Sequence, residues 1–261
     1  MIDKILLLPQ IGGIYNVNQI ADSHANFRGN SQFDTVEINS VGKYTTEKYL
    51  KEAVNNNPQI AKIIDKYNPD LELNMEDLLQ LQSNHATDIK NVANSIIDNL
   101  PKSLQARVNK EAILDAAQLH DIGKVLIPSE ILNKPDKLTP EEKEIMKKHS
   151  LLSYELLKNT DIDEYTLNLV KYHHQNANLT GYPKIDNNFT PDINLQILTV
   201  ADAYSALTEK RPYKNTLSPK QALTIIYHEH VKTGNIHPFV FNALIKSINL
   251  NPVYKQGAVE V

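Results

Sequence analysis

Hydrophobic residues recur at steps of three and four along most of the chain after residue 44, which is the period of an amphipathic α-helix. The longest such run extends from Asn74, which suits an N-cap, to Leu100, where Pro101 follows. Its inward stripe consists of Leu78, Gln82, His85, Ile89, Val92, Ala93, Ile96 and Ile97. The pattern therefore predicts a long helix that turns His85 towards the core.

Two further helices are indicated by their first residues. Thr139-Pro140-Glu141-Glu142 combines an N-cap, a proline at the first helical position and a capping-box glutamate, and it predicts a helix that carries His149. Ser218-Pro219-Lys220-Gln221 repeats this pattern. Amphipathic periods also cover Asp161 to His174, Ile193 to Lys210 and Pro238 to Ile248. Few segments alternate as strands do, so we expect an all-α domain with loops at 125–137 and 175–191.

The first 43 residues differ in composition from the rest of the chain. They are rich in Asn, Ser, Gly, Asp and Gln, and no helical period is present. We therefore expect an N-terminal arm and helical lead-in at 1–70, a principal domain at 71–251 and a tail at 252–261. The arm is interpreted either as an irregularly packed segment or as one that binds a partner or regulates the domain.

Composition excludes several classes of protein. The chain has 261 residues, 41% of them hydrophobic, which is enough for a core. Because it contains no cysteine, it has no disulfides, no thiolate zinc site and no cysteine nucleophile. Its apolar runs are too short for a signal peptide or a membrane span, so we expect a cytoplasmic protein. The net charge of −4 argues against electrostatic binding of a nucleic acid polymer.

Side chains of the metal-ligand type are spread along the predicted helices. They are His85, His120, Asp121, His149, His173, His174 and Asp202. Neighbouring helix residues point about 100° apart, but the two oxygens of Asp121 allow it to bridge two ions while His120 binds one. We expect one ion at His85, His120 and Asp202, and a second at His149 with His173 or His174. Mixed imidazole and carboxylate ligands suit Fe, Mn, Zn or Ni.

The order of these motifs resembles the HD-GYP family, a branch of the HD-domain metal-dependent phosphohydrolases that is known for hydrolysing cyclic di-GMP. The resemblance spans about residues 75–250. It is carried by the histidines above, by His120-Asp121-Ile122-Gly123-Lys124, by Gly181-Tyr182-Pro183, and by Asp202 with Arg211-Pro212-Tyr213-Lys214. Each motif is weak alone, and their order and separation make the match specific.

The resemblance implies a helical bundle around a binuclear metal site, with the seven side chains above as ligands. It implies two transition-metal ions, with Fe or Mn expected first and Ni or Zn as alternatives. Asp121 and Lys124 would be catalytic. The substrate would be bound by Lys124, Tyr182, Arg211 and Lys214.

Five positions depart from the family pattern. Gln175 replaces a usual glutamate, and Asn178-Leu179 replaces Asp-Gly, so two carboxylates have become amides. Leu81 stands where some members have a glutamate that supports a third metal, so we expect two metals. Asp88 stands where the family often has an arginine.

The resemblance implies a metal-dependent phosphodiesterase that hydrolyses cyclic di-GMP or a related cyclic dinucleotide to the linear dinucleotide or GMP, using a metal-activated water. The Gly-Tyr-Pro loop would also offer a contact for a signalling protein. Two alternatives use the same ligands: a mixed-valence di-iron oxygenase, and a receptor that binds the nucleotide without hydrolysing it. His228, His230 and His237 lie beyond the motifs and are not expected to bind metal.

Overall fold

A computed structural model of the chain describes residues 60–67, 75–209 and 216–250. Within these ranges it consists of helices and loops without a strand, which confirms the expected all-α fold class. Arg211 and Lys214 lie outside the described residues, as do 1–59 and 251–261. In chain order the elements are α2 (Ile60–Tyr67), α3 (Met75–Asn99), α4 (Lys102–Gln105), α5 (Lys110–Leu119), η2 (Ile122–Leu126), α6 (Ser129–Leu132), α7 (Pro140–Met146), α8 (His149–Leu157), α9 (Glu164–Tyr172), α10 (Ile193–Thr208), α11 (Pro219–Ile226), η3 (Tyr227–Val231) and α12 (Pro238–Leu250).

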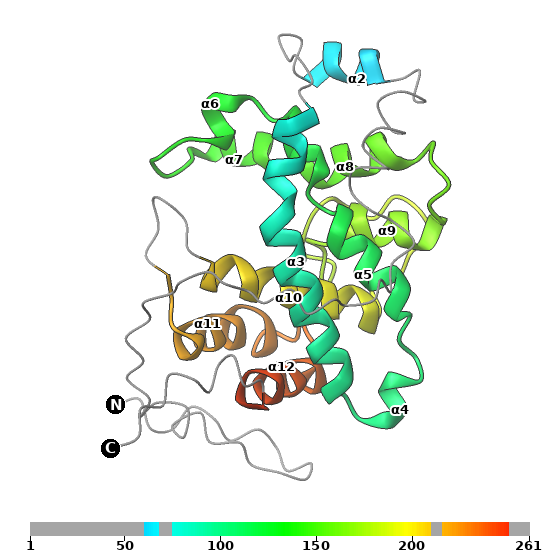
Figure 1. Ribbon diagram of the computed structural model, residues 1–261, viewed down its shortest axis with the longest axis vertical. Coiled ribbons are helices and arrows are strands. Elements are labelled where there is room, and N and C mark those ends of the chain that lie inside the picture. Colours follow the sequence, from blue (N-terminus) through cyan, green and yellow to red (C-terminus); the bar gives the residue numbers. More distant parts are fainter. Residues whose placement is uncertain (1–59, 68–74, 210–215, 251–261) are drawn as a thin grey trace.

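The long helix α3 runs lengthwise through the molecule and packs against α5, α10 and α12 (Figure 1). Its inward positions Ile89, Ala93 and Ile96 have no solvent exposure, as the hydrophobic period predicted. Each buried isoleucine contributes about 1.5–3 kcal/mol relative to an exposed one. This packing fixes the position of α3, the helix that carries His85.

A second layer forms where α8 packs against η2 and α9, and α9 packs against α5. The largest fully buried side chains come from α5, α9, α10 and α12, among other elements, and include Ile113, Leu119, Tyr172, Tyr204 and Phe241. The described residues therefore share one continuous hydrophobic core.

The helix expected from Thr139 through His149 is two helices in the structure, and that prediction was wrong. Both capping boxes are present, at Thr139 with Glu142 and at Ser218 with Gln221. However, α7 ends at Met146, and the N–H of Lys148 donates to the carbonyl of Ile145, only three residues back. This tightened turn redirects the chain, so that His149 becomes the first residue of α8.

Two smaller differences concern loops and helix starts. The expected loop at 125–137 contains the end of the 3₁₀-helix η2 and the four-residue helix α6, both too short to show a hydrophobic period. Helix α9 begins at Glu164, after the N-cap Asp163, rather than at Asp161. The segment 175–191 has no regular structure, as expected.

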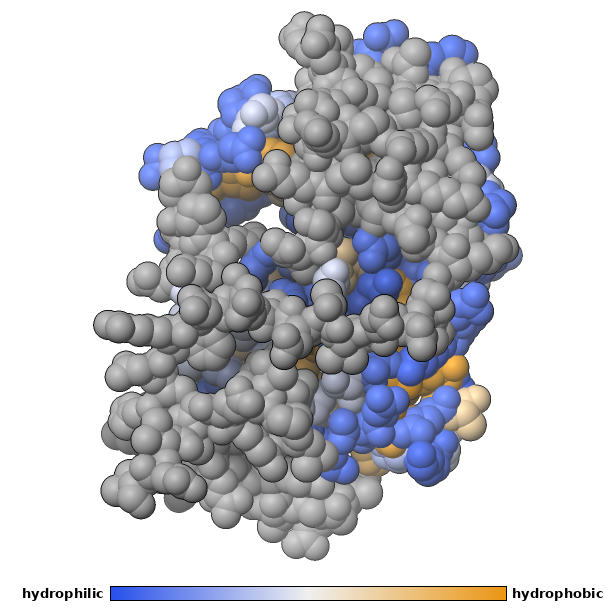
Figure 2. Space-filling model, viewed as in Figure 1, coloured by the Kyte–Doolittle hydropathy of each residue, from blue (hydrophilic) through white to orange (hydrophobic). Residues whose placement is uncertain are grey.

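The described part of the surface is predominantly hydrophilic on the face shown in Figure 2, where hydrophobic residues are visible only in small patches. None of the helices in the described ranges is both long and apolar enough to cross a membrane.

Candidate metal centre

The structure brings all seven candidate ligands to one place, each from a defined position on a helix. His85 lies inside α3, and Asp202 lies inside α10. The others lie at helix ends, where the chain changes direction: His120 caps the C-terminus of α5 before Asp121, His149 begins α8, and His173 caps the C-terminus of α9 before His174.

The first group consists of His85, His120 and Asp202, whose donor atoms lie within 4.8 Å of one another. The Nε2 atom of His85 is 3.4 Å from Oδ1 of Asp202, and the Nε2 atom of His120 is 3.8 Å from the same oxygen. These are the three residues that the sequence grouped around one ion.

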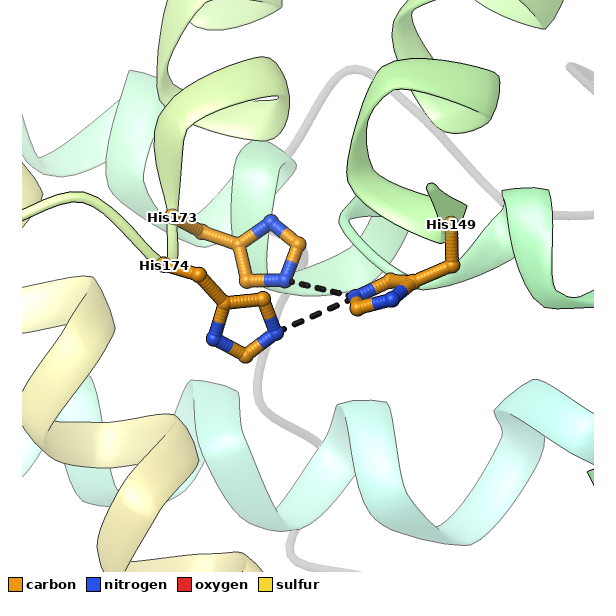
Figure 3. Close-up of side chains that lie close together, drawn as sticks. All are labelled: His149, His173 and His174. Atoms are coloured by element: carbon orange, nitrogen blue, oxygen red, sulfur yellow. Dashed lines mark hydrogen bonds between the residues drawn. The ribbon is translucent and has the colours of Figure 1, made fainter. Parts of the chain in front are cut away.

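The second group consists of His149, His173 and His174, whose donor atoms also lie within 4.8 Å of one another. Figure 3 shows the three rings turned towards one another, His149 from α8 and the other two from the end of α9. The Nε2 atom of His149 lies 3.2 Å from Nε2 of His173 and 3.1 Å from Nε2 of His174. Both His173 and His174 face His149, whereas the sequence left open which of the two would join His149 at the second ion.

Asp121 lies between the two groups and directs one oxygen to each. Its Oδ2 is 3.4 Å from Nε2 of His120 and 3.9 Å from Nε2 of His85. Its Oδ1 is 3.3 Å from Nε2 of His149. The carboxylate therefore has the placement that a ligand bridging two cations requires.

Hydrogen bonds orient three of the imidazoles. The Nδ1 atoms of His120, His149 and His173 lie 3.0, 2.7 and 2.7 Å from the carbonyl oxygens of the residues three positions earlier, which are Ala117, Met146 and Val170. Because a carbonyl can only accept, each Nδ1 carries the proton and donates it. The neutral ring then presents the lone pair of Nε2 to the centre, which is the tautomer that a metal ligand needs.

The donor atoms fit a cation. The Nε2 atoms of His149 and His173 are 3.2 Å apart, and with both protons on Nδ1 neither atom can donate to the other. Nε2 of His120 is buried without a hydrogen-bond partner. Converging lone pairs and carboxylate oxygens repel one another unless positive charge lies between them, so this arrangement suits transition-metal ions that accept nitrogen and oxygen donors.

Electrostatics separate the histidines into two kinds. Burial lowers the pKa of His149 and His173, and it lowers the pKa of His174 to about 3, so these rings are neutral. Burial also acts to lower the pKa of His85, but the carboxylates of Asp202 and Glu209 outweigh it and raise that pKa to about 9. His85 therefore faces the most negative part of the centre.

The two aspartates stay ionised. Burial alone would raise the pKa of Asp121, but the ammonium of Lys124 beside it holds that pKa well below its usual range. In the same way, the hydrogen bond with the protonated His85 holds the pKa of Asp202 below its usual range against burial. Both carboxylates are thus charged and available as ligands.

Gly123 and Ser153 fix η2 against the start of α8. A Cβ atom on Gly123 would lie 2.2 Å from the carbonyl oxygen of His149, so only glycine fits this approach. The Ser153 hydroxyl accepts from the N–H of Gly123 at 2.8 Å and lies 2.6 Å from the carbonyl oxygen of His120 and 2.9 Å from that of His149. These contacts set the spacing between the two groups of ligands.

Two of the expected substrate-binding residues border the centre. The Lys124 ammonium contacts Oδ2 of Asp121, and its side chain is 27% exposed. The ring of Tyr182 lies 4.7 Å from the ring of His174, centroid to centroid. Burial and the two aspartates raise the pKa of Tyr182, so its phenol keeps its proton as a donor. Arg211 and Lys214 lie outside the described residues, and all four roles stay predictions.

The amide at Gln175 holds the Gly-Tyr-Pro loop. Gln175 is 2% exposed; its Oε1 accepts from the N–H of Gly181 at 2.7 Å, and its Nε2 donates to the carbonyl of Pro183 at 2.9 Å. The loop packs closely, because a Cβ on Gly181 would lie 2.1 Å from the carbonyl oxygen of His174. An amide both donates and accepts here, which a carboxylate cannot do.

Asn178 uses its amide in a similar way. Its Nδ2 donates to the carbonyl of Thr233 at 2.8 Å and to Oδ1 of Asn235 at 3.1 Å, which ties the loop to the turn after η3. The amides of Gln175 and Asn178 therefore have positioning roles in the loop of this chain.

The backbone of Leu179 is left-handed, with a φ of 58°, at a position where the family has glycine. This conformation costs roughly 1–2 kcal/mol in a residue with a side chain.

Sequence reasoning missed Ser153 and Glu209. Oε2 of Glu209 lies 3.3 Å from Nδ1 of His85. A signal for it existed, because Glu209 follows Asp202 by seven residues, two helical turns along the same face. Within the described part of the chain, the groups of side chains able to hold a metal do not include His228, His230 or His237, and the expectation that these three bind no metal stays a prediction.

Known proteins that are similar to this chain include cyclic dinucleotide phosphodiesterases. A cyclic di-GMP phosphodiesterase of Thermotoga maritima is 38% identical over 133 residues, which are 50% of this chain and 36% of that protein. A 3′3′-cGAMP-specific phosphodiesterase 1 of Vibrio cholerae is 30% identical over 153 residues, 58% of this chain and 35% of that protein. The chain therefore spans about a third of the length of these curated relatives.

Two solved structures share the fold. Bd1817, described as an HDG"Y"P protein from Bdellovibrio bacteriovorus, has a TM-score of 0.51 at 16% identity and covers 78% of this chain and 61% of its own. The HD domain of the L. monocytogenes phosphodiesterase PgpH in complex with cyclic-di-AMP has a TM-score of 0.50 at 18% identity, covering 71% of this chain and 98% of its own. A family model described as HD domain matches residues 73–233. The resemblance seen in the sequence is thus confirmed, and the chain belongs to the HD domain family.

Proposed function

We propose that this chain is a metal-dependent phosphodiesterase that hydrolyses cyclic di-GMP, or a related cyclic dinucleotide, to the linear dinucleotide or GMP. The observation that carries the proposal is the placement of Asp121, whose two oxygens face two separate groups of imidazole nitrogens. The names of the relatives, which are cyclic di-GMP and cGAMP phosphodiesterases, support the reaction and the substrate class.

The proposed metal ligands follow from the two groups. His85, His120 and Asp202 would hold one ion, His149, His173 and His174 the other, and Asp121 both. We expect Fe or Mn, with Ni and Zn as alternatives, since all four accept imidazole and carboxylate donors. When bound, two such ions would supply positive charge for the phosphate oxygens and would lower the pKa of a water molecule that serves as the nucleophile.

The protein's own residues would bind and orient the phosphodiester. Lys124 is part-exposed beside Asp121, so its ammonium is placed to stabilise negative charge that develops on a nonbridging oxygen. The protonated phenol of Tyr182 would donate a hydrogen bond at the rim. Arg211 and Lys214 are proposed as further cationic contacts to substrate phosphates. The Gly-Tyr-Pro loop stays a proposed contact for a signalling protein.

The test is chromatography of cyclic di-GMP, 3′3′-cGAMP and cyclic-di-AMP after incubation with anaerobically purified protein that has been loaded with Fe(II) or Mn(II). We expect a linear dinucleotide or mononucleotide from at least one substrate. Asp121→Ala should abolish the product, whereas Asp136→Ala, at an exposed position on the loop before α7, should not.

Two other results would replace the proposal. Tight binding of the nucleotide with no product under either metal would indicate a receptor. Oxygen consumption by the ferrous protein with phosphonate or polyol substrates, without hydrolysis, would indicate the di-iron oxygenase.

A further inference from the structure

Three of the five histidines in the two groups are oriented through Nδ1 by the same kind of partner. The carbonyls of Ala117, Met146 and Val170 each belong to the last turn of a helix, α5, α7 and α9 respectively. Carbonyls in a last turn have no intrahelical N–H partner, so they are free to accept from an imidazole. The position of these histidines at helix ends therefore supplies their orientation.

His85 cannot be oriented in this way. It lies in the interior of α3, between Met75 and Asn99, where main-chain carbonyls accept from N–H groups four residues later. Its Nδ1 atom is buried and makes no hydrogen bond of good alignment, but the carboxylate of Glu209 lies 3.3 Å away, at the C-terminal end of α10. A side chain from another helix thus stands where the other rings have a backbone carbonyl.

We infer that Glu209 is a positioning residue of the first metal group, which accepts the Nδ1–H of His85 and holds its Nε2 towards Asp202 and His120. The inference rests on the proposed two-metal function. Without Glu209, the ring can carry its proton on Nε2 and donate it to Oδ1 of Asp202, 3.4 Å away, and this tautomer has no lone pair on Nε2, the nitrogen that faces the metal site.

The carboxylate also does more than a carbonyl can. A negative charge at Nδ1 increases the electron density on Nε2 and makes the imidazole a stronger donor. Loss of the carboxylate that orients a metal-binding histidine typically weakens metal affinity about 10–100-fold.

The experiment is a titration of the metal-free full chain with Mn(II), in which electron paramagnetic resonance reports the free ion. We expect two sites in the wild type. Glu209→Ala should weaken one site about 10–100-fold and leave the other unchanged. Glu209→Gln, whose amide oxygen can still accept from Nδ1, should weaken the same site by less. Glu130→Ala, at an exposed position on α6, is the matched control and should bind as the wild type does.

A double-mutant cycle separates positioning from a general effect on the fold. His85→Ala should weaken the same site, and Glu209→Ala should add nothing in that background, because its effect acts through His85. An equal loss at both sites, no loss at either, or a full additional loss in the His85→Ala background would each overturn the inference. If Glu209→Ala does not fold, as judged by a thermal melt, Glu209→Gln alone and with His85→Ala decides the question.

The outcomes also distinguish this inference from the proposed function. A wild-type protein that binds fewer than two Mn(II) ions overturns both. One that binds two ions and hydrolyses no cyclic dinucleotide overturns the function, while a selective effect of Glu209→Ala still supports the positioning role.

Discussion

The substitution Gln175→Glu tests whether the Gly-Tyr-Pro loop of this chain depends on an amide. Gln175 is 2% exposed, its oxygen accepts from the N–H of Gly181, and its nitrogen donates to the carbonyl of Pro183 at 2.9 Å. A carboxylate keeps the first hydrogen bond and loses the second. In place of a donor, a charged oxygen would then face the carbonyl oxygen of Pro183.

The size of the effect follows from these contacts. The lost hydrogen bond contributes about 1 kcal/mol, and a buried oxygen without a donor adds about 1–3 kcal/mol. We therefore expect the free energy of unfolding to fall by about 2–4 kcal/mol near neutral pH, which lowers the melting temperature by roughly 4–16 °C in a chain of this size.

The loss should depend on pH with a defined sign. The new carboxyl is neutral below its ordinary pKa of about 4.3, and its O–H can then donate to Pro183 as the amide does. Because ionisation is unfavourable at this buried position, the folded-state pKa is raised. The variant therefore approaches wild-type stability at low pH and becomes less stable as the pH rises through the raised folded-state pKa.

The assay is a set of thermal melts at about pH 4, below the ordinary carboxyl pKa, and at about pH 7.5. Gln221→Glu is the matched control, since the oxygen of Gln221 accepts from Ser218 at the start of α11 and a glutamate there keeps the capping box. If Gln175→Glu melts with the wild type at both pH values, the amide donor to Pro183 is not needed and the reasoning is refuted.

Two further predictions concern the ligand elements. Gly123→Ala should lower the free energy of unfolding by about 2–3 kcal/mol, because the new Cβ would lie 2.2 Å from the carbonyl oxygen of His149. A melting temperature equal to that of the wild type would contradict this close approach. Metal binding should release about one proton at pH 7, because His85, with its pKa raised to about 9, must lose the proton on Nε2, whereas the pKa values of His149, His173 and His174 are already lowered. Calorimetry in buffers of different ionisation enthalpy should show that this proton release disappears above about pH 10. The apparent metal affinity should fall as the pH drops below about 9. No proton release at pH 7 would argue against a protonated His85.

The sequence by itself determined the elements and residue types that depend on local signals. The inward stripe of α3 and the capping boxes at Thr139 and Ser218 involve residues within a few positions of one another, so period and residue type were sufficient. The order of the histidine and aspartate motifs likewise identified the seven candidate ligands, and the structure brings all of them together.

Only the tertiary structure decided how these ligands are oriented. The turn between α7 and α8 that places His149, and the donors at Gln175 and Asn178, were not visible in any local pattern. The spacing from Asp202 puts Glu209 on the same helix face, but only the packing of α10 against α3 brings its carboxylate beside His85. Their roles depend on which carbonyl or side chain from a separate segment lies within hydrogen-bond distance. Hydrogen bonds are short and directional, so the partner of a buried polar atom is known only when the packing of the helices has fixed the positions of both.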